Sequence, residues 1–124
     1  MKLDRIEIDL VPFTFVCETK NTHYGFTHVC RLFEFDNCYN ELEKATATYY
    51  NRTWEKYRYQ TVMLAAVQKR IEHVIADEKK CFMLANNLKR LAGANKEQFE
   101  KLMQENGYIL KLQKLKKDLQ ENCY

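Results

Sequence analysis

The hydrophobic period of this chain changes once, near Tyr59. Before that point apolar and polar side chains alternate, as they do along a strand that buries one face. Beyond it apolar residues recur at three- and four-residue steps, which is the spacing of one helix face. A single change of period predicts strands first and helices last. We therefore expect an α+β fold with a small N-terminal antiparallel sheet followed by a helical C-terminal half.

Three strands are expected in the first part of the chain. The first covers residues 6–17 and is interrupted at Pro12, which has no N–H to donate to a sheet ladder. A polar turn leads to a returning strand over residues 24–33, so the two form a hairpin. The third strand is expected at residues 45–57, immediately before the helical period begins.

The apolar stripe that starts at Tyr59 meets no helix breaker before Gly93, a plausible C-cap. It predicts one long helix or two helices separated at residues 77–80. A second helix should follow and end at Gly107. These helices offer more apolar surface than three strands need, so we expect a helical hairpin within the chain or, as the alternative, a homodimer through the C-terminal helices. A final stripe lies at Tyr108, Leu112, Leu115 and Leu119.

The length of 124 residues predicts a single domain over residues 1–124, with 1–57 mainly β and 58–124 mainly α. Charged side chains fill the first ten residues, where a signal peptide would need an apolar region. No apolar run approaches the roughly 20 residues of a membrane span. We expect a cytoplasmic protein without membrane contact, in the host cytoplasm if a phage encodes it.

The five cysteines are odd in number and widely spaced, and no C-x-x-C motif occurs. This pattern favours reduced thiols over disulfides and predicts neither a bound metal nor a cofactor. A metal cluster is the alternative if the N-terminal strands pair, although buried thiols packing as small apolar groups are favoured. Its ligands would be Cys17, His28, Cys30 and Cys38.

No catalytic signature is present in the sequence. Three isolated glycines cannot form a phosphate-binding loop, and neither G-x-S-x-G nor H-E-x-x-H occurs. His28 and Cys30 would share one strand face, but core packing explains them better than a thiolate–imidazole pair. His73 is expected to be a solvated or partly buried helix side chain. We therefore expect a protein that is not an enzyme and has no catalytic residues.

Residues 44–70 carry six basic side chains and one acidic side chain. The same segment is rich in aromatic residues, which stack on bases or on a partner's side chains while cations contact phosphates or carboxylates. The alternative is structural, with Trp54 packed beneath the first helix. The predicted binding residues are Tyr50, Arg52, Trp54, Lys56 and Arg58.

Residues 49–62 read YYNRTWEKYRYQTV. This stretch resembles small accessory proteins encoded by phages and mobile elements of Gram-positive bacteria, which carry a similar Tyr-x-Asn-x-Thr-Trp-Glu-x-Tyr-x-Tyr-Gln-x-Val core after a short β region. Small phage proteins of this size include inhibitors of host defence, anti-CRISPR proteins among them, that act by binding. The resemblance implies a non-enzymatic inhibitor of a host protein or ribonucleoprotein complex, such as a nucleic-acid-guided nuclease. The alternative is a small nucleic-acid-binding protein that uses the aromatic-basic strand.

Overall fold

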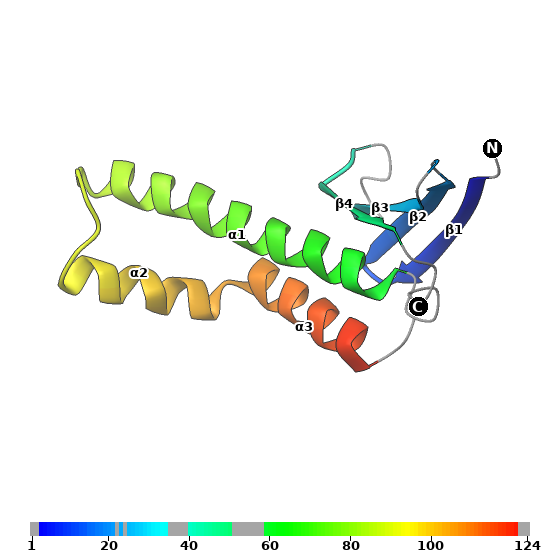
Figure 1. Cartoon of the computed structure of the whole chain (residues 1–124). Helices are drawn as coiled ribbons and strands as arrows, with labels where there is room; N and C mark the ends of the chain where they lie inside the picture. Colours follow the sequence, from blue (N-terminus) through cyan, green and yellow to red (C-terminus); the bar gives the residue numbers. More distant parts are fainter. Residues whose placement is uncertain (1–2, 22, 24, 35–39, 51–58, 122–124) are drawn as a thin grey trace.

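The computed structural model describes residues 3–21, 23, 25–34, 40–50 and 59–121 (Figure 1). An antiparallel sheet comes first and three helices follow, so the expected α+β order is confirmed. The sheet has the simple strand order β1-β2-β3-β4. Its strands are β1 (Leu3–Leu10), β2 (Phe13–Asn21), β3 (Phe26–Glu34) and β4 (Glu43–Tyr49). The helices are α1 (Gln60–Ala85), α2 (Ala94–Glu105) and α3 (Gly107–Glu121).

The described sheet has four strands because the chain reverses at Pro12. Leu10 lies opposite Phe13 in the ladder between β1 and β2, so Val11 and Pro12 form a two-residue turn. Proline suits a turn because its missing N–H and fixed φ are no disadvantage there. Residues 6–17, predicted as one interrupted strand, therefore belong to a hairpin of two strands.

One face of the sheet packs against α1. Alternate residues of β2 and β3 are buried on this face, as the period of two requires. The first half of α1 covers them, and α3 packs beside α1 to complete the core. The sheet contributes Phe13, Phe15, Cys17, Cys30 and Leu32; α1 contributes Val62, Met63, Ala66, Val67 and Ile71; α3 contributes Leu112, Leu115 and Leu119.

Helix α1 is continuous through residues 77–80, so the expected alternative of a break there is wrong. It ends at Ala85, well before Gly93, and its second half runs beyond the sheet (Figure 1). The chain then folds back as α2, which confirms the predicted helical hairpin. We name residues 72–105 the arm: its base still contacts β4 through His73, and Figure 1 shows its far end projecting away from the sheet.

Two glycines have roles different from those predicted. Gly93 precedes α2 as its N-cap, with φ of 60°, and its carbonyl accepts hydrogen bonds from the backbone N–H groups of Lys96 and Glu97. Gly107 is the first residue of α3, and the Asn106 side chain caps this helix by accepting from the Ile109 N–H at 3.0 Å. Among the described helices, none is both long and apolar enough to cross a membrane.

Candidate functional site at the sheet–helix junction

Tyr50 is the predicted binding residue that the structure describes. It directly follows β4, and 76% of it is exposed. On β4 itself Thr46 and Thr48 are exposed, whereas Ala47 and Tyr49 on the other face are half-buried. Tyr50 thus continues the exposed side of β4. The remaining predicted binding residues, Arg52, Trp54, Lys56 and Arg58, lie outside the described residues.

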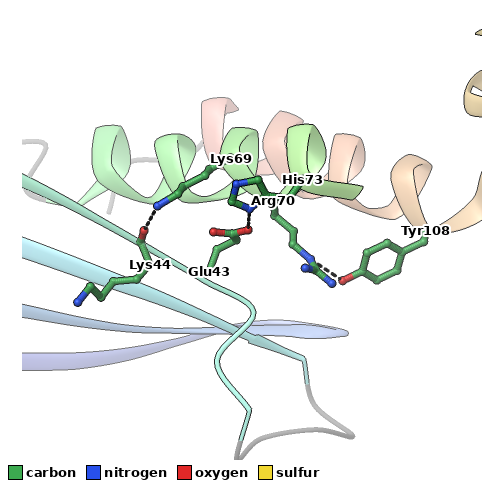
Figure 2. A network of polar contacts seen from close by, with 6 residues as sticks. All are labelled: Glu43, Lys44, Lys69, Arg70, His73 and Tyr108. Carbon is green, nitrogen blue, oxygen red and sulfur yellow. Dashed lines mark hydrogen bonds and ion pairs between the residues drawn. The ribbon is translucent and has the colours of Figure 1, made fainter. Parts of the chain in front are cut away.

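A set of polar contacts joins the start of β4 to α1 and α3 (Figure 2). Glu43, the first residue of β4, lies opposite Leu32 and is only 7% exposed. A buried carboxylate needs a charged or hydrogen-bonding partner. His73 of α1 supplies it through Nδ1, which bonds Glu43 Oε1. Because the His73 side chain is 55% exposed, the imidazole spans from the buried carboxylate to solvent.

Lys69 lies one helical turn before His73 and ties α1 to the backbone of the same strand. Its Nζ donates to the Lys44 carbonyl oxygen at 3.2 Å. Figure 2 shows the Lys44 side chain itself directed away from this contact. Lys44 and Lys69 are both exposed.

Arg70 extends from α1 toward α3. Its Nε donates to the Tyr108 hydroxyl at 3.4 Å, and its guanidinium carbon lies 5.6 Å from the centre of the Tyr108 ring. Tyr108 is itself held by an edge contact with Phe13, with ring centres 6.4 Å apart. The guanidinium is therefore positioned by a residue that packs on the core.

These contacts form one site, which we name the junction cluster. It combines three basic side chains of α1 with the exposed Lys44 of β4, and His73 is the one that bonds the buried carboxylate of Glu43. Such an arrangement attracts carboxylates or phosphates, because cations held in place lose less conformational entropy when they bind an anion. The junction cluster consists of Glu43, Lys44, Lys69, Arg70, His73 and Tyr108.

The junction cluster was not predictable from the sequence because its contacts join residues that are far apart along the chain. Glu43 and His73 are 30 positions apart, and Arg70 and Tyr108 are 38 apart. One local signal existed. Glu43 alternates in step with Ala45 and Ala47 along β4, so its side chain lies on the buried side of the strand. A carboxylate in that position requires a partner.

Strand pairing brings Cys17 and Cys30 together in the core. They are directly opposite each other in the ladder between β2 and β3, and both are fully buried. A hydrogen bond with Cys17, together with burial, raises the pKa of the Cys30 thiol far above its ordinary value. Cys30 therefore packs as a neutral thiol at physiological pH.

His28 takes part in a buried polar network instead of a pair with Cys30. Thr19 Oγ1 lies 2.9 Å from His28 Nδ1 and 2.6 Å from the Tyr59 hydroxyl. Cys30 Sγ instead approaches the Tyr59 carbonyl oxygen at 4.0 Å. Within the part of the chain that the structure describes, no three metal-ligating side chains cluster, and Cys38 lies outside that part.

The sheet face opposite α1 carries a different kind of surface. A hollow of about 440 Å³ lies over β1, β2 and the end of β3. Its rim contains three carboxylates and one guanidinium, and Arg5 and Glu7 form an ion pair at 3.4 Å. The acidic rim makes the junction cluster the better candidate for an anionic partner. The hollow is lined by Arg5, Glu7, Asp9, Thr14, Val16, Phe33 and Glu34.

Comparisons with protein-family models, with curated proteins and with solved structures found no match to this chain.

Proposed function

We propose that this chain is a non-enzymatic binding protein that inhibits or modulates a host macromolecule. The observation that carries the proposal is the junction cluster, in which Lys69, Arg70 and His73 of α1 are each held by a hydrogen bond close to the start of β4, where Glu43 is buried. The resemblance at residues 49–62 supports an origin in a phage or a mobile element. The specific function that we propose is anti-CRISPR-type inhibition of a nucleic-acid-guided nuclease. The partner is a host protein or ribonucleoprotein complex with an acidic surface.

Two features suit the junction cluster to binding a large partner. Lys44 and Lys69 project from different elements, so their spacing is set by the packing of α1 on β4 and not by one flexible loop. Tyr50, with 76% of its surface exposed, directly follows the other end of β4 and can contribute a large ring to an interface that extends along this strand. Exposed aromatic and basic side chains together are typical of the residues that dominate protein interfaces.

The test is affinity capture from a lysate of a Gram-positive bacterium, followed by identification of the proteins that are retained. The wild-type chain should hold a stoichiometric partner, and the double variant Lys44→Glu with Lys69→Glu should lose it. Both side chains are exposed, so the fold should tolerate the change. A matched control reverses two exposed lysines elsewhere, Lys20→Glu with Lys117→Glu, and should retain the partner.

Two results would count against this function. Equal loss of the partner in the matched control would show that net charge, and not the junction cluster, determines capture. Recovery of no partner by the wild-type chain, together with turnover of a substrate, would reject a non-enzymatic binding protein altogether.

A second candidate function is direct nucleic-acid binding, and the observation that favours it is the exposed ring of Tyr50 close in sequence to basic residues. Aromatic rings stack on unpaired bases, and each stacked base contributes about 1–3 kcal/mol. An oligonucleotide shift assay should show binding that weakens steeply with salt, because each phosphate contact releases counterions. Tyr50→Ala should weaken binding more than Thr46→Ala on the same strand, and absence of binding at low salt would remove this candidate.

A further inference from the structure

The arm has charges of opposite sign at its two ends. Phe82 of α1 packs on Phe99 of α2, and the turn end of the arm beyond this contact, residues 83–98, has three basic residues and one acidic residue. The part nearer the sheet, residues 72–82 and 99–105, has five acidic residues and three lysines. All of these charged side chains are exposed. The basic tip carries Lys89, Arg90 and Lys96, and the acidic root carries Glu72, Asp77, Glu78, Glu100 and Glu105.

Helix dipoles do not account for this separation. The last turn of α1 has no basic residue, although a cation is most favourable there. Glu97 in the first turn of α2 is the acid that the dipole explains. Within the described part of the chain, no ion pair engages the tip cations, so their charge is uncompensated in a single copy.

An apolar groove runs along the middle of the arm and includes Glu78 of the acidic root in its lining. Its volume is about 360 Å³, and its lining comes from matching stripes on α1 and α2 at three- and four-residue steps. The two helices touch through Phe82 and Phe99, whose ring centres are 5.5 Å apart. The groove remains open beside them, because Cys81 is exposed and Leu102 is 44% exposed. Its apolar lining is Cys81, Phe82, Ala85, Phe99, Leu102 and Met103.

We propose that the occupant of this groove is the arm of a second copy of the chain, related by a two-fold axis. In an antiparallel pairing the basic tip of one copy lies against the acidic root of the other, and two-fold symmetry repeats this contact. The apolar groove of each arm then faces the other near the axis, and the four helices form a bundle. The net charge along the arm changes from negative at the root to positive at the tip, so two arms are complementary in this antiparallel orientation. The tip and the groove contain no residue of the junction cluster, whose His73 lies at the base of the arm, so this self-association does not depend on the proposed function.

The experiment measures self-association by sedimentation equilibrium with charge-reversed variants. The tip variant carries Lys89→Glu with Arg90→Glu, and the root variant carries Glu78→Lys with Glu105→Lys. The wild-type chain should reach twice its monomer mass of 14.9 kDa as concentration rises from about 1 μM toward about 1 mM. Each variant alone should have a dissociation constant at least about tenfold higher, because like charges then face each other.

The decisive result comes from mixing the two variants. Together they should form a heterodimer as tight as the wild-type dimer, because a negative tip meets a positive root at both contacts. The matched control, Lys111→Glu with Lys114→Glu on the exposed side of α3, should dimerise like the wild type. Circular dichroism of every variant confirms that the helices are intact.

Three outcomes would overturn the proposal. A wild-type mass of 14.9 kDa at all concentrations would mean that the groove does not take a second copy. Dimers that persist equally in both variants would use another surface. Failure of the mixed variants to associate, while the wild type does, would exclude the antiparallel tip-to-root pairing.

Discussion

At the scale of single residues, the described cysteines differ in their predicted reactivity. Cys81 is exposed on the arm, whereas Cys17 and Cys30 are buried in the sheet. The thiolate is the nucleophile in alkylation, and contact with Cys17 and burial raise the pKa of Cys30. We expect iodoacetamide to modify Cys81 in the native protein and to reach Cys17 and Cys30 only after unfolding. Peptide mass spectrometry measures this, and native modification of Cys30 at the rate of Cys81 would contradict it.

The raised pKa of Cys30 also predicts how stability depends on pH. The unfolded thiol ionises near its ordinary value of 9.0, while the folded thiol keeps its proton. The stabilising contribution is therefore complete below that pH and decreases as the pH rises above it. Cys30→Ala should show a shallower decrease in the free energy of unfolding above this pH than the wild type, measured by denaturant titration. Parallel curves for the two proteins would contradict the assignment.

The Thr19, His28 and Tyr59 network predicts a coupling between two hydroxyl groups. Tyr59→Phe removes the hydroxyl that lies 2.6 Å from Thr19 Oγ1 and leaves the ring in the core. The expected loss of stability is about 1 kcal/mol, the usual net value of a buried hydrogen bond. Thr19→Val in the Tyr59→Phe background should cost less than it does alone, because the partner is already gone. Additive costs in the double-mutant cycle would show that the two hydroxyls do not interact.

At the scale of elements, Gly25, just before β3, lies where the backbone passes very close to the end of β4. A Cβ placed at Gly25 would lie 2.0 Å from the Tyr49 backbone oxygen, and backbone atoms cannot move aside cheaply. Gly25→Ala should therefore destabilise the protein by about 1–3 kcal/mol. Gly107→Ala is the matched control, because nothing lies within 4 Å of its Cβ position and alanine favours the start of α3. Thermal unfolding should show opposite shifts, and a neutral Gly25→Ala would mean that β4 lies farther away.

The elements themselves were largely predictable from hydrophobic period. The change of period at Tyr59 located the start of α1, which is Gln60. The number of strands was not predictable in the same way. Buried positions change from even to odd numbers between Leu10 and Phe13, and both a bulge and a two-residue turn produce that change. The pairing of Glu43 with His73 depends on how α1 crosses β4, and no local pattern encodes that crossing.

At the scale of the whole molecule, the structure separates a core from a less supported arm. The main core cluster contains residues of β1, β2, β3, α1 and α3, and among its described members none comes from α2. Phe99 is the buried residue of α2, and it packs on Phe82 beyond the sheet. Helices with few buried contacts open locally at a lower free energy than the core. The arm should therefore be the least stable described helical part of a single copy.

Hydrogen exchange tests this uneven stability and links it to self-association. In the monomeric tip variant, amides of α2 should exchange faster than those of α1 residues 62–71, because α2 can open while the core stays folded. In the wild type the same α2 amides should become more protected as protein concentration rises, since association through the arm stabilises the paired form. Core amides should not respond to concentration in this way. Exchange of α2 as slow as that of the core in the monomeric variant would mean that the arm unfolds only with the whole molecule.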